Sequence, residues 1–561
     1  MYLDFLVKIP GETGKITQMK KAGTVYVYYE YERIYNPAKK YNVPKRAAIG
    51  KLSKKDGSMM IPNQNFIKFF PEAELPEDKT TAGRSSCLRI GSYIVIKSIV
   101  EGYKLNGIID KYFDGADAGL FFDLVAYSII CENNAGQYYP EYAYNHPLFT
   151  EGMRIYSDSK ISDFLNTITD DQHVGFLNEW NATMDHREKI YISYDSTNKN
   201  CQAGDIEMVE YGHAKKDCGL PVFNYSIAYD TNNRKPLFYE EYPGSIVDVS
   251  QLQIMLEKAK GFGYKRAGFI LDRGYFSKDN IQYMDACGYD FVIMAKGMAD
   301  LVRGMITVNK GAFENNRKCS IREYRAYGMT IKGKLYATDE TERYFHLFYS
   351  SPKECAEREI IEANVERMAK FLKKQEGKPS ARCAGCGKYF DLFTDEKDDI
   401  FLFAREKAEI IEEEISLCGY FVIVTSQKMT AKEAIALYKS RDTSEKLFRG
   451  DKSYLGNKSI RVYSDESAAA KIFIEFVALI VRNKIYTDLK DEMFRNDKKA
   501  NYMTVPAAIK ELEKIEMVRL LDHKYRLDHA VTATQKAILN AFGMDAAYIK
   551  NKAIEISDRL L

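Results

Sequence analysis

The sequence predicts an α/β protein in which a mixed sheet with helices is interrupted by an α+β insertion domain and preceded by a mainly helical N-terminal region. Three patterns support this fold class. Helical periodicity dominates between about residues 61 and 186, strands and helices then alternate, and the alternation pauses between about residues 297 and 417. We therefore divide the chain into six predicted segments: 1–60, 61–186, 187–296, 297–417, 418–490 and 491–561.

Residues 1–60 are predicted to be rich in β-structure and to carry positive charge. Val25, Val27 and Tyr29 alternate with other residues, as the side chains on one face of a strand do. Lysines and arginines then gather among few acids and are interleaved with tyrosines: Tyr35, Lys39, Lys40, Tyr41, Lys45, Arg46, Lys51, Lys54 and Lys55. Such a segment suits the phosphate backbone of DNA, although a solvated protein face can have the same composition.

Residues 61–186 are predicted to form a helical domain. Apolar residues recur every three or four positions over residues 91–113 and 118–133. A third helix is expected over residues 159–185, and it contains Trp180, the only tryptophan of the chain. Helical bundles of this kind often bind DNA, but no helix-turn-helix is recognisable, and plain packing accounts for the pattern.

The alternating part of the chain predicts the α/β core. Strand-like and helical segments follow one another in the order strand 189–197, strand 222–230, strand 235–244, helix 245–263, strand 266–274, helix 277–288 and strand 290–296. Hairpin strands and a long helix then replace the alternation, so residues 297–417 are interpreted as an insertion. A strand at 419–426 and a helix at 428–448 resume the core, and a helical C-terminal region, suited to oligomerisation, follows from residue 491.

Composition narrows the possible function classes. The 561 residues carry a formal net charge of only +2, so any contact with a polyanion must be local. Ten cysteines are scattered without the spacing of a disulfide framework, and the first residues do not resemble a secretory signal, which predicts a reduced, cytoplasmic protein. The longest apolar run, residues 472–486, contains Glu475 and is expected to be a buried core helix and not a membrane span.

Three carboxylates are the candidate catalytic residues. Asp195 is expected at the end of the first core strand, Asp272 at the end of the fourth, and Glu445 on the helix that follows the last strand. Carboxylates that converge in this way can hold two Mg²⁺ ions roughly 3.5–4 Å apart, the arrangement that assists phosphoryl transfer. Oxygen ligands favour Mg²⁺ or Mn²⁺ over zinc.

Glu445 belongs to a polar stripe on its predicted helix. Tyr438, Arg441, Glu445 and Lys452 follow one another at intervals of three, four and seven residues, which an α-helix brings to one face. Taken alone, an arginine and a glutamate four residues apart are most simply a solvated ion pair worth a few tenths of a kcal/mol. The stripe alone therefore does not indicate a function, and the sequence motifs elsewhere in the chain have to be considered with it.

That context resembles a known enzyme family. The sequence reads "YDST" around Asp195, "LDRGYFSKDNIQYM" around Asp272, and "YKSRDTSEKLFRGDK" over the stripe, whose spacing is Tyr-x2-Arg-x3-Glu-x6-Lys. These motifs, in this order, resemble those of the DDE transposases of bacterial insertion sequences, whose core has the ribonuclease H-like fold. The 173 positions between Asp272 and Glu445 also resemble the spacing of family members that carry an inserted domain.

The resemblance implies metal-dependent cleavage at the ends of an insertion sequence, followed by transfer of the 3′ hydroxyl into target DNA. Double-stranded DNA with terminal inverted repeats would be the partner, bound by a homodimer near the bacterial nucleoid, with residues 61–186 contributing to end binding. Two alternatives stay open: a ribonuclease H-like nuclease that only cleaves, and a non-catalytic DNA-binding protein derived from a transposase.

Further residues take roles from the same resemblance. Arg441 and Lys452 would contact phosphate, and Tyr438 would bond a phosphate oxygen or the terminal hydroxyl. His213 and Lys215, with the adjacent Lys216, resemble a family motif that approaches DNA, although a surface loop explains them equally well. Relatives often hold a flipped base with a tryptophan of the inserted domain, which this chain lacks; Tyr336 or a phenylalanine is the candidate replacement.

One pair of cysteines suggests a weaker possibility. Cys383 and Cys386 have half of the spacing of a zinc site, and Cys355 and His346 are the best remaining candidate ligands. Because these two do not form a matching pair motif, structural zinc is the less favoured reading.

Overall fold

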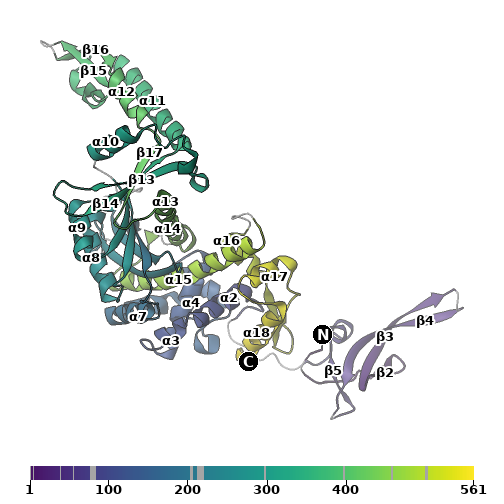
Figure 1. Cartoon of the computed structure of the whole chain (residues 1–561). Helices are drawn as coiled ribbons and strands as arrows, with labels where there is room; N and C mark the ends of the chain where they lie inside the picture. The colour runs from purple at the N-terminus through teal and green to yellow at the C-terminus, as the bar shows by residue number, and fades with distance from the viewer. Residues whose placement is uncertain are drawn as a thin grey trace. The chain divides into compact units, whose positions relative to one another are not determined.

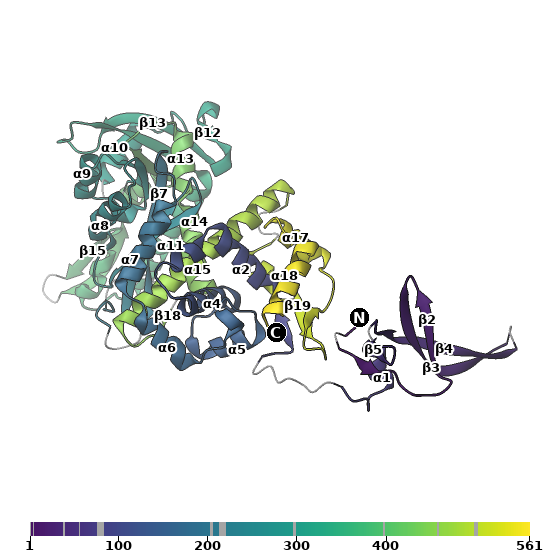
Figure 2. The ribbon, with the colours of Figure 1, turned by 90° about the horizontal axis from the view of Figure 1, so that it is seen from below.

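A computed structural model describes residues 2–3, 5–37, 40–54, 56–75, 84–201, 206–211, 220–295, 299–395, 399–456, 459–498 and 503–560. Its contacts divide the chain into two compact units. The first contains residues Met1–Ile168 and Phe473–Leu561, and the second contains Thr169–Ile472. Figures 1 and 2 show the elements of each unit.

The first unit begins with a five-stranded antiparallel sheet, so the N-terminal region is partly sheet. Its strands follow the order β1-β5-β4-β3-β2: β1 (Val7–Lys8), β5 (Met59–Pro62), β4 (Tyr41–Leu52), β3 (Thr24–Asn36) and β2 (Ile16–Lys21). Helix α1 (Gln64–Phe69) begins at Asn63, whose side chain accepts the N–H groups of the first turn. Phe66 of α1 packs with Val27, Ile49 and Met60 in the core beneath one face of the sheet.

The rest of the first unit is mainly helical. Its helices are α2 (Gly91–Gly102), α3 (Leu105–Ile109), α4 (Gly115–Cys131), α5 (Tyr139–Asn145), α6 (Asp158–Thr167), α16 (Val505–Leu512), α17 (Ala533–Asn540) and α18 (Ala546–Arg559). A small sheet joins β6 (Cys87–Arg89) to β19 (Glu516–Arg519) and β20 (Tyr525–Leu527), which the predicted helical C-terminal region did not include.

Two predicted helices are each divided in the structure. The segment 91–113 forms α2 and α3, separated where Lys104 adopts a left-handed φ of +56°. The segment 159–185 forms α6 and α7 (Asp170–Ala182), because the side chain of Thr169 caps a new helix in a capping box with Gln172. Local capping therefore overrides the continuous apolar periodicity.

The apolar run 472–486 lies within α15 (Asp465–Arg495) and is largely buried, as expected for a core helix. Glu475 accepts a hydrogen bond from the Asn134 side chain at 3.1 Å, which satisfies one oxygen of this buried acid. Among the described residues, no helix combines the length and the apolar character needed to cross a membrane.

A large mixed sheet forms the centre of the second unit. Its order is β12-β13-β14-β17-β11-β10-β7-β8-β9, with β18 beside β7. The strands are β7 (Ile190–Cys201), β8 (Val222–Asp230), β9 (Lys235–Pro243), β10 (Ala267–Leu271), β11 (Asp290–Met294), β12 (Ser320–Ile321), β13 (Ala326–Lys334), β14 (Glu342–Tyr349), β17 (Tyr420–Thr425) and β18 (Ser459–Ile460). Strand β10 is parallel to both β7 and β11, while the β8, β9, β13, β14 and β17 pairings are antiparallel. This confirms the predicted mixed α/β sheet and is consistent with a ribonuclease H-like core.

Helices cover both faces of this sheet. On one face, α13 (Ala431–Lys439) packs through Ile435 and Tyr438 against Ile270, Val292 and Ile423. The other face carries the alternate side chains of the same strands and lies near α8 (Asp248–Gly261) and α9 (Lys278–Ala286). Figure 1 shows α8 and α9 on the side of the sheet away from α13.

The inserted segment is divided between the sheet and a separate lobe. Strands β13 and β14, which we expected inside the insertion, pair through β17 with the central sheet. The lobe comprises α11 (Ser351–Lys373), β15 (Phe390–Asp395), β16 (Ile400–Glu406) and α12 (Ala408–Ser416), gathered at one end of this unit in Figure 1. It has a core of its own, which includes Val365, Leu372, Phe390 and Phe401.

Candidate active site

Asp195 and Asp272 lie side by side on neighbouring parallel strands. The pairing of β7 with β10 ends at Tyr194 opposite Leu271, and the two acids are the next residues on each strand. Both side chains point to the face that carries α13, because Asp272 shares the parity of Ile270 and Asp195 shares that of Ser193. The two carboxylates therefore meet where the parallel pairing stops.

One expectation about Asp195 was wrong. Strand β7 does not end there but continues to Cys201, and Asp195 pairs with Ile227 of β8. The polar residues 198–200 look like a turn in the sequence, yet they are buried and continue the pairing of β7 with β8. On its other side, β7 pairs with β10, and this pairing ends one residue before Asp195. Asp195 therefore lies at the end of the parallel pairing and not at the end of its own strand.

Backbone hydrogen bonds orient both aspartates. The N–H of Ser196 donates to Oδ1 of Asp195 at 2.9 Å, and the N–H of Arg273 donates to Oδ1 of Asp272 at 2.8 Å. The Asp272 side chain remains 38% exposed. The contacts of Asp272 with the Arg273 N–H, the Tyr438 hydroxyl and Arg441 all involve Oδ1.

The helix that was expected to carry the polar stripe is broken. Helix α13 starts in a capping box formed by Thr430 and Glu433, and α14 (Asp442–Tyr454) starts after Ser440 and Arg441. The N–H of Arg441 bonds to the carbonyl of Tyr438 at 3.3 Å, a tighter turn than that of an α-helix. Tyr438 is thus on α13, Arg441 is at the junction, and Glu445 is in the first turn of α14.

Arg441 joins acids from two different elements. Its guanidinium lies 3.3 Å from Oδ1 of Asp272 and 3.0 Å from Oε1 of Glu445, and its side chain is only 14% exposed. Burial alone would lower its pKa. The groups around it outweigh burial and raise the pKa above its ordinary value: Tyr438, Asp272, Asp195 and Glu445. Arg441 therefore bridges Asp272, which follows β10, and Glu445 of α14.

Tyr438 supports this arrangement from α13. It is 5% exposed, and its hydroxyl donates to Oδ1 of Asp272 at 3.5 Å. Burial, only partly opposed by the charge of Arg441, raises the pKa of Tyr438 to about 12. The phenol is consequently a proton donor at neutral pH, aimed at an acid and not at solvent.

A buried ion pair connects α14 to β7. Nζ of Lys199 lies 3.0 Å from a carboxylate oxygen of Asp451, and both side chains are at most 1% exposed. The same ammonium lies 4.1 Å from the ring centre of Tyr225 on β8. Because Lys199 and Asp195 share one face of β7, this pair fixes α14 over the strand that carries Asp195.

Of the other residues predicted to bind DNA, the structure describes only Lys452. Lys452 lies in the last turn of α14 and is half-buried. His213 and Lys215, with Lys216, lie outside the described residues. Their predicted roles stay predictions.

The donor set suits a hard divalent cation, although its present spacing does not form a complete ligand cluster. Asp195, Asp272 and Glu445 offer carboxylate oxygens, the ligands that Mg²⁺ and Mn²⁺ prefer. No three acid, histidine or cysteine side chains in the described part of the chain are close enough to bind one metal ion. Two of the acids instead bond to Arg441.

The cysteines of the weak zinc motif are core residues. Cys383 and Cys386 are buried among Val365, Phe390 and Phe401 in the lobe. His346 is buried elsewhere, between the hydroxyls of Thr330 and Thr425 at 2.9 Å each. Cys355 is exposed on α11. The four candidate ligands are thus spread over different surroundings.

Trp180 and Tyr336, the two aromatic residues considered for base stacking, lie in different surroundings. Trp180 is buried in α7, and its indole N–H donates to the carbonyl of Pro236 at 2.9 Å, so it is a packing residue. Tyr336 lies beyond the end of β13 with its ring centre 5.4 Å from Nζ of Lys278 on α9. Tyr324, which the sequence patterns did not single out, packs beside α13.

Comparison with known families matches residues 188–481, just over half of the chain, to a family described as "Transposase DDE domain". The matched range contains all three candidate acids and the polar stripe. No curated protein matches the chain.

Proposed function

Because the chain belongs to the transposase DDE domain family, we propose that it cuts DNA at the ends of a mobile element and joins the freed 3′ hydroxyls to target DNA. The observation that carries this proposal is that Asp195 and Asp272 follow paired residues on neighbouring parallel strands, while Arg441 contacts both Asp272 and Glu445 of α14. Both steps are phosphoryl transfers, in which the protein contributes position and charge.

We assign the metal-binding role to Asp195, Asp272 and Glu445. Divalent ions bound there would stabilise the attacking and leaving oxygens of an in-line displacement. Arg441 holds Asp272 and Glu445 near each other and offsets the repulsion between them. Tyr438 limits the rotation of Asp272 through its hydroxyl. The Lys199–Asp451 pair keeps Glu445 on the same side of the sheet as the two aspartates.

The activity is tested with the purified chain and linear DNA that carries the sequences flanking its gene. With Mg²⁺ or Mn²⁺ we expect new 3′ ends at the element boundary and covalent joining of those ends to a plasmid, and with EDTA we expect neither. Cleavage without joining would support the nuclease alternative. Binding without either reaction would support the non-catalytic alternative, and the transposase proposal would be wrong.

For recognition of the DNA ends, we propose the N-terminal sheet. Residues 1–75 contain 13 lysines and arginines and seven acids, a net charge of +6 in a chain whose total is +2. Direct cross-strand pairing places Met19, Tyr26 and Lys51 in one row and Thr17, Tyr28 and Ala48 in the next, on the face opposite the Phe66 core. A β-ribbon with basic and aromatic side chains can enter the major groove.

Neutralising this face is expected to weaken end binding. Lys21 and Lys51 lie on it, because Lys21 pairs with Thr24 and Lys51 with Tyr26. For Lys21→Gln/Lys51→Gln, the plot of log affinity against log salt should become shallower by about 1.8, or about 0.9 for each lost phosphate contact. Fluorescence anisotropy with labelled end DNA measures this. Lys68→Gln, on α1 across the sheet, is the matched control and should leave the slope unchanged.

End binding by the helical domain, oligomerisation through the C-terminal region and a homodimer in the DNA complex stay predictions. Light scattering of the chain with and without end DNA would test the homodimer, which requires two copies of the chain for each pair of ends. A complex that contains a single chain would count against it.

A further inference from the structure

A short segment at the edge of the central sheet carries four exposed cations. They are Arg317, Lys318, Arg322 and Arg325, and within these nine residues the one acid is Glu323. None of the four forms an ion pair with a described residue, whereas many exposed lysines and arginines of the chain do, for example Lys332 with Glu342 at 2.6 Å. We call these four residues the edge cations. Unpaired positive charge at this density calls for an anionic partner.

The segment is held in place by an apolar anchor. Two short 3₁₀ turns, Arg317–Cys319 and Arg322–Tyr324, flank β12, which is the outermost strand at its end of the sheet. Ile321 and Ala326 are buried in the same cluster as Ile435 and Tyr438 of α13. The backbone that carries the edge cations is therefore packed, and their side chains project from a fixed surface.

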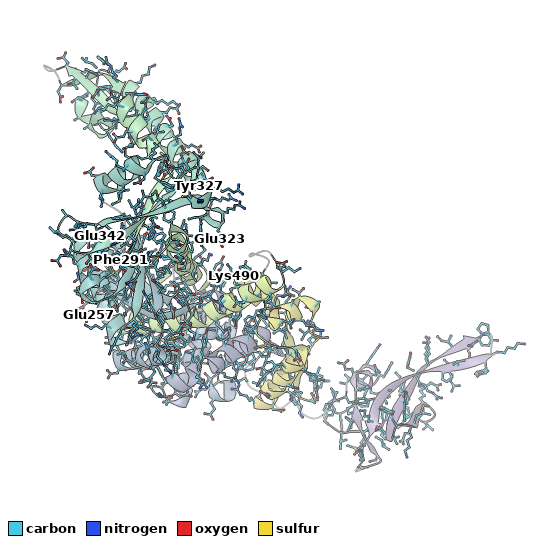
Figure 3. The ribbon with its side chains drawn as sticks, in the orientation of Figure 1. Glu257, Phe291, Glu323, Tyr327, Glu342 and Lys490 are labelled. Atoms are coloured by element: carbon cyan, nitrogen blue, oxygen red, sulfur yellow. The ribbon has the colours of Figure 1, made fainter. Side chains whose placement is uncertain are left out.

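The same anchor places the edge cations beside the candidate active site. Tyr324 packs against the cluster that contains Tyr438, the residue whose hydroxyl contacts Asp272. The pKa of Tyr324 is raised by burial, by Glu323 and by the charge of Asp442, the first residue of α14. Figure 3 shows Glu323 and Tyr327 on the side of the sheet near α13 and α14, while Glu342 lies at the opposite end of these strands.

The charge of the candidate acids explains why cations beside them would help to bind DNA. A DNA strand that reaches Asp195, Asp272 and Glu445 brings phosphates toward carboxylates, which repel them. Arg441 cannot offset this alone, since it is already bonded to two of the acids. Cations beside the acids, but not bonded to them, can hold the neighbouring phosphates.

We propose that the edge cations bind the phosphate backbone of the DNA duplex on one side of the bond that reacts. The inference rests on the proposed function and adds a second DNA contact, separate from the N-terminal sheet. Backbone contacts carry no sequence information. The edge cations should therefore bind element ends and unrelated target DNA alike.

The test uses Arg322→Gln/Arg325→Gln in the full chain, with a labelled duplex of unrelated sequence and a labelled end duplex. For both, the slope of log affinity against log salt should become shallower by about 1.8. The matched control is Lys332→Gln/Lys334→Gln, which removes the same charge from the opposite end of β13. At about 3.4 Å per residue, the strand β13 separates the two pairs by roughly 25 Å.

The outcomes separate the two proposals. Equal slopes in the edge variant and the wild-type chain, or an equal change in the control, would overturn the inference even if the wild-type chain cleaves and joins DNA. A change of slope seen with the end duplex but not with the unrelated duplex would also overturn the inference, because the contact would then be sequence-specific. Absence of cleavage and joining by the wild-type chain, with the expected slope change, would instead count against the proposed function alone.

Both variants should unfold at the wild-type temperature, since all substituted side chains are exposed.

Discussion

Asp272→Asn is expected to reduce DNA cleavage and joining more than about a hundredfold, while end binding stays near the wild-type level. The substitution preserves shape but removes a charge that both Arg441 and a bound divalent cation would use. Asp195→Asn and Glu445→Gln should behave in the same way. Product formation is measured on labelled end DNA at saturating Mg²⁺, and binding is measured in Ca²⁺ or EDTA.

The control for this series is Glu412→Gln, which removes an exposed acid from α12 in the lobe and should leave cleavage unchanged. Folding is followed by thermal unfolding, because loss of an acid from a crowded site also relieves repulsion and need not destabilise the chain. If one of the three variants cleaved at the wild-type rate, that acid would not be part of the catalytic set. Equal loss of binding and cleavage would point instead to a DNA-contact role.

The three candidate acids could be singled out from sequence because the elements around them follow local patterns. Asp272 follows a short apolar strand, and a strand end is visible in the alternation of residues. Glu445 follows Tyr438 and Arg441 at intervals that remain close to helical spacing even though the helix is broken. The resemblance to a transposase family then supplied the link between segments that are far apart in the chain.

The features that were missed depend on pairing between distant residues. Strand β7 extends past Asp195 because its polar second half pairs with β8, and no local pattern in the sequence indicates that pairing. Strands β13 and β14 look like an isolated hairpin in sequence and join the sheet only through β17, about 75 residues later in the chain. The break before Arg441 has residues with helical dihedrals on both sides, so propensity does not reveal it.

The edge cations were missed for a different reason. Arg317, Lys318, Arg322 and Arg325 have no common helical or strand period, since two short turns and a two-residue strand carry them. Their significance comes from the packing of Ile321 and Ala326 beside α13, which is a property of the folded chain. Charge density along the sequence could have singled them out, but not their position beside the acids.

Lys199→Met is expected to destabilise the second unit by about 3–5 kcal/mol, because it leaves the carboxylate of Asp451 buried without its cation. Asp451→Leu should cost a similar amount, because it removes the carboxylate that forms the buried ion pair with Lys199. The double variant should recover most of this loss, since an apolar pair of similar volume leaves no buried charge. Urea unfolding gives the change in stability, and hydrogen exchange over residues 190–201 and 442–454 locates it.

The double variant also separates stability from the positioning of Glu445. If the pair stabilises only the fold, the double variant should cleave DNA as fast as the wild-type chain once its stability is restored. If the geometry of the pair also sets the register of α14 over β7, cleavage should stay reduced while end binding and stability recover. We expect the second result, because Lys199 bonds to α14 six residues after Glu445 and shares a strand face with Asp195. Additive losses in stability, with no recovery in the double variant, would show that the two side chains are not coupled.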